Sequence, residues 1–209
     1  MWAPELQAGA ITEESARRTE MVQSQIEREK TRTTMSREEF LESLNVRVEQ
    51  FSIRNVRHPR FARAFELINK SNQFNTTGMR WSQEQVERYF EAGGSFEAFH
   101  VEDRFTDYGL VAVAILMANR LEQFVMSCRV IGLDVELAAI GSLARTTLAD
   151  YNKLTANFAE TQQNIICRDL YSRCGFDFDG TTWRISTRSA LPQADHVTFR
   201  NASEEPVSG

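Results

Sequence analysis

The sequence predicts an α/β (α+β) protein, and two neighbouring patterns carry that prediction. An apolar run is short enough to form a buried strand, and it consists of Phe124, Val125, Met126, Val130 and Ile131. Gly132 then supplies the backbone freedom that a sharp turn needs. Asp134 is then expected to cap a helix with its side chain. The apolar positions of this helix recur at helical spacing: Leu133, Leu137, Ile140, Ala144 and Leu148. Strand, tight loop and helix in succession form the building unit of α/β folds.

Helices and one strand are predicted before this unit. A polar helix is expected from Thr12 to about Lys30, where apolar positions are few. Two capping boxes, Ser36 to Glu39 and Ser82 to Gln85, each predict the start of a helix. Alternation from Val46 to Ile53 predicts an edge strand, and apolar spacing from Phe61 to Ile68 predicts another helix.

Further strands are predicted on both sides of the unit. Residues 96–117 are expected to form a hairpin that turns at residues 106–109, and residues 154–158 a weak strand. A last hairpin is predicted at 176–185, turning at Asp179 and Gly180. Between them, a helix is predicted from Thr161 to Arg173. The apolar side of this helix is expected to carry Ile165, Ile166, Leu170 and Tyr171.

Length and charge limit the class of protein. A chain of 209 residues is long enough for one domain with its own core and an extension. We expect a helical connector at 1–50, the domain at 51–190 and a loose tail at 191–209. The formal net charge of −5 disfavours nucleic acid as a partner. No segment approaches the roughly 18 apolar residues of a membrane span, so we expect no membrane association and a cytoplasmic location.

The cysteines and histidines indicate neither disulfides nor a metal. Cys167 and Cys174 fall on one predicted helix about 10 Å apart along its axis, beyond disulfide reach. His58, His100 and His196 are scattered without the spacing of metal ligands. The sequence therefore predicts no metal site and no tightly bound cofactor.

Several motifs in fixed order resemble known families. The order of predicted elements resembles the GNAT acyltransferase fold, a mixed central sheet flanked by helices, with the segment from Arg129 to Asp134 where that fold keeps its pantetheine loop. Four further motifs follow one another along the chain: Asn72-Gln-Phe-Asn75-Thr-Thr77, Asp103-Arg-Phe-Thr-Asp107-Tyr-Gly-Leu110, Ser127-Cys-Arg-Val-Ile-Gly132 with Val135-Glu136, and Thr161-Gln-Gln-Asn164. Together they resemble, more specifically, the C-terminal domain of FkbH-like proteins.

The resemblance implies an activity and partners. FkbH-like proteins transfer a glyceryl group from an acyl phosphate to the phosphopantetheine thiol of an acyl carrier protein, in polyketide extender-unit biosynthesis. They also carry an N-terminal phosphatase-like domain of the haloacid dehalogenase class, which implies a separate phosphatase-like domain as a further partner and makes residues 1–50 the trailing edge of that domain. The match of Asp177 to Thr181 to the phosphatase signature is interpreted as a hairpin turn instead, because too little chain follows it for the phosphatase sheet.

Cys128 is the candidate nucleophile. Acyl transfer through a thioester needs a thiolate, and Arg129 together with the following helix N-terminus can lower the pKa of a neighbouring thiol. The alternative is a small, buried strand residue, since free cysteine is among the most buried residue types. Strand alternation would direct Cys128 and Arg129 to opposite faces unless a bulge intervenes.

Polar residues in the other motifs complete the predicted site. Asp103, Asp107 and Glu136 can position or protonate a substrate group, although Asp107 also suits a turn. The remaining candidates for substrate binding are neutral donors, the Arg129 guanidinium and the Gly132 loop: Asn72, Gln73, Asn75, Arg129, Gly132 and Asn164. The alternatives are a loop that satisfies its own backbone and, for Asn164, a helix cap.

Departures from the FkbH-like pattern separate three hypotheses. Leu133 and Gln163 replace usual positive charges, Asp134 replaces a glycine, and Thr106 and Tyr108 replace glycine and asparagine. An acid at Asp134 would repel a diphosphate, which disfavours a coenzyme A-dependent GNAT acetyltransferase. The leading hypothesis is the FkbH-like acyltransferase, and the alternative from another class is a non-catalytic carrier-binding module.

Overall fold

The chain folds around one mixed eight-stranded sheet. The computed structural model describes residues 35–192 and 194–202, so the predicted helix from Thr12 to Lys30 lies outside the described residues. The strands, in the order β6-β7-β5-β4-β3-β2-β1-β8, form a single sheet. Their bounds are β1 Val46–Ile53, β2 Ser95–Glu102, β3 Asp107–Met117, β4 Arg120–Met126, β5 Leu154–Ala156, β6 Asp177–Phe178, β7 Trp183–Ile185 and β8 Val197–Asn201. The predicted α/β class, with a mixed central sheet flanked by helices, is confirmed.

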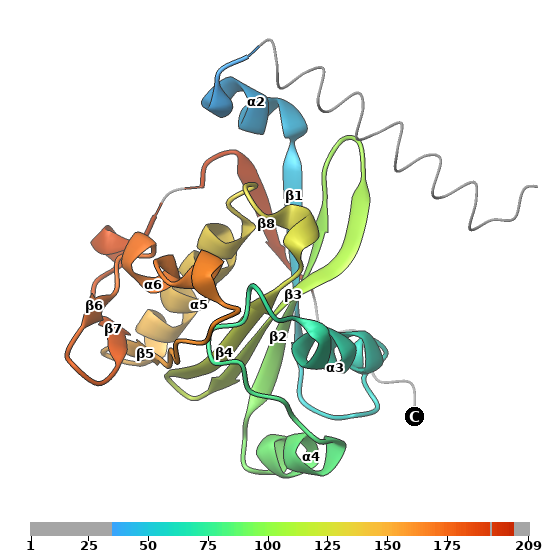
Figure 1. Ribbon diagram of the computed structural model, residues 1–209, viewed down its shortest axis with the longest axis vertical. Helices are drawn as coiled ribbons and strands as arrows, with labels where there is room; N and C mark the ends of the chain where they lie inside the picture. Colours follow the sequence, from blue (N-terminus) through green and yellow to red (C-terminus); the bar gives the residue numbers. More distant parts are fainter. Residues whose placement is uncertain (1–34, 193, 203–209) are drawn as a thin grey trace, which may run out of the picture.

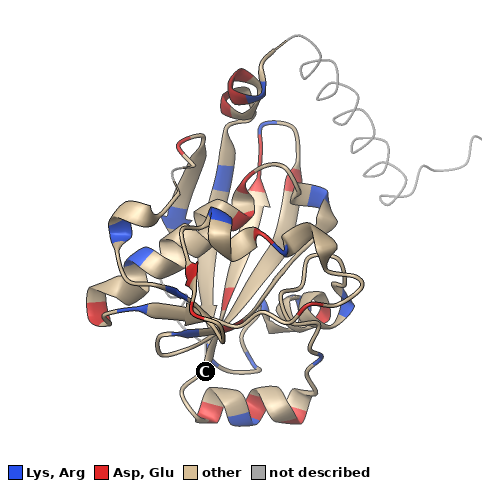
Figure 2. Cartoon of the chain, turned by 60° about the vertical axis from the view of Figure 1, so that its left-hand side comes forward, with Lys and Arg blue, Asp and Glu red and all other residues tan. Residues whose placement is uncertain are grey.

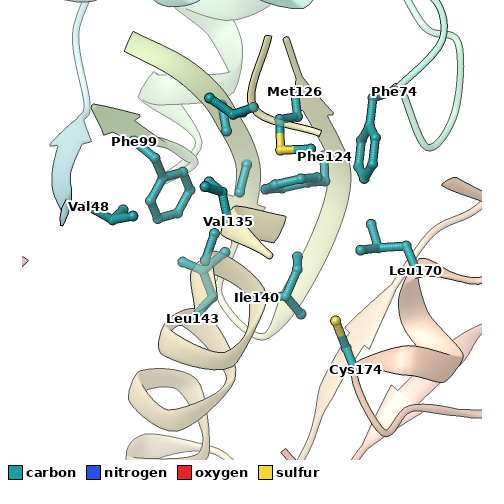
Figure 3. Packing of buried hydrophobic residues seen from close by; sticks show 14 of the residues in the cluster. Val48, Phe74, Phe99, Phe124, Met126, Val135, Ile140, Leu143, Leu170 and Cys174 are labelled. Atoms are coloured by element: carbon teal, nitrogen blue, oxygen red, sulfur yellow. The ribbon is translucent and has the colours of Figure 1, made fainter. Parts of the chain in front are cut away.

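Helices cover both faces of this sheet (Figure 1). Their bounds are α2 Arg37–Leu44, α3 Phe61–Lys70, α4 Gln83–Glu91, α5 Val135–Asp150 and α6 Leu170–Arg173. The core on one face joins α2, α5 and α6 to the sheet, and Figure 3 shows the centre of its packing. The core on the other face is built from α3, α4 and the opposite side chains of β1 to β4. Because the strands contribute apolar residues to both cores, the central strands are apolar along most of their length.

The β1 strand lies inside the sheet, not at its edge as the alternation predicted. Its neighbour on one side is β2, and on the other side β8 pairs with it in parallel from Val46↔Val197 to Gln50↔Asn201. Part of the predicted loose tail is therefore an ordered edge strand. The tail sequence shows little apolar periodicity, since β8 is mostly exposed and is held by backbone hydrogen bonds to β1.

Local sequence signals are confirmed at two helix starts and one turn. The Ser36 and Ser82 side chains each accept from the backbone N–H three residues on, in complete capping boxes. The β6–β7 hairpin is also confirmed, with the Asp179 Oδ1 accepting from the N–H groups of Thr181 and Thr182. These signals succeed because each involves residues within one turn of each other.

Two predicted elements differ from the structure. The β2–β3 hairpin forms, but its turn precedes Asp107, which already belongs to β3. The helix predicted over 161–173 is instead a 3-10 turn at Ile165–Cys167 followed by the short α6. As a consequence Ile165 and Ile166 are exposed rather than packed on an apolar side.

Replacing Phe124 with alanine tests the core beneath α5. Phe124 is fully buried and its ring meets that of Phe74 edge-on at 6.0 Å between centroids. We expect Phe124→Ala to lower the free energy of unfolding by about 3–5 kcal/mol, measured by urea denaturation, because the cavity it leaves collapses only partly. The control Phe178→Ala removes a ring that is 55% exposed and should change stability by less than about 1 kcal/mol. Equal effects of the two variants would contradict this account of the core.

Candidate functional site at the end of strand β4

Strands β4 and β5 separate soon after they meet. They run in parallel but pair only at Arg120↔Thr155 and Leu121↔Ala156, after which the Asn157 N–H donates to the Leu121 carbonyl at 2.9 Å. The rest of β4, up to Met126, has no partner strand on that side in the sheet order. An open strand edge presents backbone donors and acceptors that must be satisfied.

A short segment from the α3–α4 connection occupies this edge. Asn75 forms an antiparallel bridge with Val125. The Thr76 N–H donates to the Phe124 carbonyl at 3.0 Å, and the Met126 N–H donates to the Phe74 carbonyl at 2.9 Å. On the far side, the Ala159 N–H donates to the Thr76 carbonyl at 2.9 Å. Residues 74–76, hereafter the inserted segment, thus lie between β4 and the chain that leaves β5, and Figure 3 shows Phe74 beside Phe124 and Leu170.

Three buried amide side chains hold the inserted segment in place. The Asn75 Oδ1 accepts from the Gln123 Nε2 at 2.7 Å and from the Gly78 N–H at 2.8 Å. The Asn164 Nδ2 donates to the carbonyls of Asn75 and Ala159, both at 2.9 Å. Asn75, Gln123 and Asn164 are each fully buried. In this arrangement Asn75 and Asn164 support the backbone and are shielded from solvent, and Asn164 makes no side-chain helix cap.

The sequence analysis missed Gln123, although one signal pointed to it. A glutamine directly before the apolar run Phe124 to Met126 is unusual in a buried strand, and its side chain must find partners there. Its amide serves Asn75, the Met79 carbonyl and the Trp81 indole N–H. No local pattern could identify those partners, because they lie more than forty residues away in the chain.

Cys128 lies just beyond the end of β4 and is exposed. The strand ends at Met126, earlier than the apolar run suggested, and a 3-10 turn follows at Cys128–Val130. The Ser127 Oγ accepts from the Arg129 N–H at 3.4 Å and from the Arg129 Nε at 3.3 Å. The interpretation of Cys128 as a buried strand residue is therefore wrong. Because Cys128 and Arg129 lie in a 3-10 turn, strand alternation does not determine the directions of their side chains.

Two predicted binding motifs meet at this end of β4. The bridge between Asn75 and Val125 directs the inserted segment antiparallel to β4, so Gln73 and Asn72 come toward the end where Ser127 and Cys128 follow. Asn72, Gln73, Arg129 and Gly132 are exposed there, and Gly132 turns the chain with a φ of +85°. The Asn72 Oδ1 accepts from the Arg80 guanidinium, so this amide already has one partner.

The N-terminus of α5 contains two buried carboxylates. Asp134 has a left-handed φ of +58° and makes no side-chain cap, contrary to the prediction. Its oxygens instead accept from the Arg37 Nη2 at 2.9 and 3.0 Å. Glu136 is 3% exposed, and its Oε1 accepts from the Arg173 Nη2 at 2.9 Å. Its Oε2 is buried with no hydrogen-bond partner among the described residues.

These carboxylates lie where a helix N-terminus can hold an anion. Burial raises the pKa of Glu136 above its usual 4.5, although its own backbone N–H and Arg173 act to lower it. A helix N-terminus binds phosphate when its N–H groups and dipole face an open, uncharged or basic loop. Here Asp134 and Glu136 place acidic groups at that position. Each of these acids is paired with an arginine, Asp134 with Arg37 and Glu136 with Arg173.

Asp103 and Asp107 lie at the β2–β3 turn. The Asp103 Oδ2 accepts from the Tyr108 hydroxyl and its Oδ1 from the Phe105 and Thr106 N–H groups, all at 2.8 Å. Asp107 accepts from the Gly109 N–H at 2.8 Å and lies 2.7 Å from the His100 Nε2. Burial acts to raise the pKa of Asp107, but these two hydrogen bonds outweigh it and lower the pKa.

The turn lies away from Cys128 along β3. The Ser127 N–H donates to the Val111 carbonyl, and Asp107 comes four residues before Val111 in β3. At about 3.3 Å per residue, this places Asp107 on the order of 13 Å along the strand from that contact. The structure thus gathers Cys128, Arg129, Gly132, Asn72 and Gln73 at one end of β4, and it places Asp103 and Asp107 elsewhere.

The described residues contain no group of three or more His, Cys, Asp or Glu side chains suited to a metal ion. In the same part of the chain, no helix combines the length and apolar character needed to cross a membrane. Figure 2 shows acidic and basic positions interspersed over the helices and loops.

Comparisons with known proteins give structural neighbours but no family. No protein-family model matches the sequence, and no curated protein matches it. A GNAT-family acetyltransferase from Streptococcus pneumoniae aligns over 65% of this chain and 98% of its own, at 10% identity and a TM-score of 0.46. A putative acetyltransferase from Acinetobacter baylyi aligns over 72% and 99%, at 11% identity and a TM-score of 0.47. Spermidine N-acetyltransferase from Vibrio cholerae, solved with CoA and spermine, aligns over 68% and 98%, at 16% identity and a TM-score of 0.46. Such values carry no statement about what this chain binds or catalyses.

The exposure of the cysteines predicts selective alkylation. Burial raises the pKa of Cys167 to about 11 and also raises the pKa of Cys174, so neither buried thiol supplies thiolate near neutral pH. We expect iodoacetamide at pH 8 to add one group to the folded protein, mapped by peptide mass spectrometry to Cys128, and three groups after denaturation. Native labelling of Cys167 or Cys174 at a comparable rate would show that this region opens.

The buried Glu136 predicts a pH dependence of stability. Because its pKa is raised in the folded state, the folded protein holds this proton more tightly than the unfolded chain. Its contribution to stability is fully present below pH 4.5, the usual value, and is lost as the pH rises through the folded pKa. We therefore expect wild type to lose stability relative to Glu136→Gln as the pH rises above 4.5, measured as the free energy of unfolding by urea denaturation.

The exposed Asp179 supplies a control of opposite sign. Hydrogen bonds from the Thr182 and Thr181 N–H groups lower the pKa of Asp179, so its contribution is present above pH 3.8 and lost as the pH falls. We expect wild type to gain stability relative to Asp179→Asn as the pH rises toward 3.8, measured in the same way. If the stability difference between wild type and Glu136→Gln stays constant as the pH rises above 4.5, the buried state of the Glu136 carboxyl group is contradicted.

Proposed function

We propose that this protein is a GNAT-like acyltransferase of the FkbH-like type, which moves a small acyl group through a thioester on Cys128. The observation that carries the proposal is the position of Cys128, exposed in a 3-10 turn at the end of β4 and beside the exposed Asn72 and Gln73. A nucleophile at a strand end, in a loop that leads into a helix, is accessible while its backbone is held by the sheet.

The proposed reaction has two steps. The Cys128 thiolate attacks the acyl carbonyl of an activated donor, forming the carbon–sulfur bond while the donor's leaving group departs with its electron pair. The thiol proton passes to solvent at this exposed position. In the second step the thiol of a carrier protein's phosphopantetheine arm attacks the thioester, and the Cys128 sulfur leaves as thiolate. The amide groups of Asn72 and Gln73 offer neutral donors and acceptors to the hydroxyls of a glyceryl group.

The carboxylates have supporting roles in this proposal. Glu136 is bound to Arg173, Asp103 to Tyr108 and Asp107 to His100, so none is assigned a proton transfer to substrate. A carrier protein delivers its thiol on a single phosphodiester, whereas free coenzyme A brings a diphosphate. The buried Asp134 and Glu136 at the start of α5 therefore favour a carrier-bound thiol over free coenzyme A.

A second candidate is a non-catalytic module that binds a carrier protein. Ile131, Ile165 and Ile166 are large apolar residues with 44% to 60% exposure. Ile131 follows the Cys128 turn, and Ile165 and Ile166 follow Asn164, which holds the inserted segment. Exposed large apolar residues favour protein contact. In this alternative the Cys128 region is a docking surface, and the phosphatase-like partner performs the chemistry.

Intact-mass spectrometry separates the two candidates. The protein is incubated with a synthetic glyceryl thioester of N-acetylcysteamine, and we expect one added glyceryl group that hydroxylamine removes. Cys128→Ser should form no adduct. The matched control is Cys128→Ser with Ser186→Cys, which moves the exposed thiol to another exposed position and should also form no adduct at the wild-type rate.

Two outcomes would overturn the catalytic proposal. Equal acylation of the relocated thiol would mean that Cys128 is acylated only because it is exposed. Absence of an adduct, together with carrier-protein binding that Cys128→Ser leaves unchanged, would favour the docking module.

A further inference from the structure

A cavity lies beside α4, apart from the Cys128 site. It has a volume of about 300 Å³ and is lined by Met79, Arg80, Trp81, Gln85, Arg88 and Tyr89. Gln123, which anchors one wall, precedes Cys128 by five residues along β4, a distance of roughly 16 Å at the rise of an extended strand. The α4 helix lies at the lower end of the molecule in Figure 1.

The wall that carries Trp81 is held rigidly. The Trp81 N–H donates to the Asn69 Oδ1 at 2.9 Å, and the Asn69 Nδ2 donates back to the Trp81 carbonyl at 3.0 Å. The indole N–H donates to the Gln123 Oε1 at 2.8 Å, and the Gln123 Nε2 donates to the Met79 carbonyl at 3.0 Å. The backbone and the indole of Trp81 are thus both fixed before any ligand binds, which lowers the entropic cost of binding.

The opposite wall is formed by Tyr89. Its ring meets the Trp81 ring edge-on, with centroids 5.1 Å apart. The ring also rests on Gly94, where a Cβ atom would come within 2.2 Å of the Tyr89 ring. Gly94 is therefore needed for this close approach, and the two aromatic rings with the Met79 thioether form an apolar cavity suited to an aromatic group.

The cavity carries one available positive charge. The Arg80 guanidinium is committed to the carbonyls of Ile68 and Ser71 and to the Asn72 amide. Arg88 has a side chain that is 66% exposed, and its nearest acid, Glu84, is 3.7 Å away and still more exposed. Such a surface pair is weak in water, so the Arg88 guanidinium can bind a ligand anion instead.

One polar group beside the cavity has no partner. The Tyr89 hydroxyl is buried and has no hydrogen-bond partner among the described residues. Burial raises the pKa of Tyr89, and the nearby Glu122 raises it further, so the hydroxyl remains protonated. A buried hydroxyl without a partner is unfavourable in the free protein, and because it has almost no accessible surface it is not assigned to the ligand.

We propose that this cavity is a second binding site, which takes a small aromatic carboxylate. The aromatic ring packs against Trp81, Tyr89 and Met79, and the carboxylate accepts from the Arg88 guanidinium. The volume suits one ring and its acid group, at the small end of the range for ligand sites. This proposal does not rest on acyl transfer at Cys128.

Titration with phenylacetate, followed by NMR, tests the proposal. The probe is the indole N–H signal of Trp81 in the ¹⁵N-labelled full chain, identified by its loss in Trp81→Phe among the three tryptophans. We expect a saturable shift with phenylacetate and a weaker response to phenylacetamide, which lacks the charge, and to acetate, which lacks the ring. Arg88→Gln should weaken phenylacetate binding by about tenfold, the effect of losing one charge-assisted hydrogen bond.

Two further variants make the test specific. Arg63→Gln removes another exposed helical arginine that is paired with an acid, Glu66, away from the cavity, and should leave binding unchanged. Tyr89→Phe should leave phenylacetate binding unchanged and should stabilise the free protein, because it removes a buried hydroxyl that has no partner and does not reach the ligand. The proposal is overturned if acetate or phenylacetamide binds as tightly as phenylacetate, if benzylamine binds more tightly, or if no saturable shift occurs.

Discussion

The hydrogen bond between the side chains of Asn75 and Gln123 joins the two parts of the sheet that would otherwise separate. Strand β5 leaves β4 after two residue pairs, and the backbone groups beyond that point need other partners. The inserted segment supplies them, and Asn164 fixes it from the opposite side. Fully buried amide networks of this kind are stabilising only when every member is satisfied, so the three amides act as one unit.

This network connects both proposed sites. Toward one end of β4 it positions Asn72 and Gln73 beside the Cys128 turn. Toward the other, the same Gln123 amide holds the wall of the cavity through Met79 and Trp81. A change in the amide network would therefore reach both places through the rigid backbone of the inserted segment, although the two sites are proposed to bind different ligands.

The start of α5 carries two buried acids. A helix N-terminus in a strand–loop–helix unit is a favourable place for an anion, and in this chain the anions are its own carboxylates. Asp134 and Glu136 are held by Arg37 and Arg173, which ties α2 and α6 to α5. The two ion pairs hold this corner of the fold together.

The sequence by itself determined the α/β class, both capping boxes, the β6–β7 turn and the strand–loop–helix unit, because each depends on residues close together in the chain. Only the tertiary structure decided that β8 pairs with β1, that Cys128 lies in an exposed turn, and that Asn75 and Asn164 are buried. Those outcomes depend on which distant segment satisfies an open strand edge. The sequence alone does not distinguish a polar side chain that faces a ligand from one that binds a backbone carbonyl across the fold.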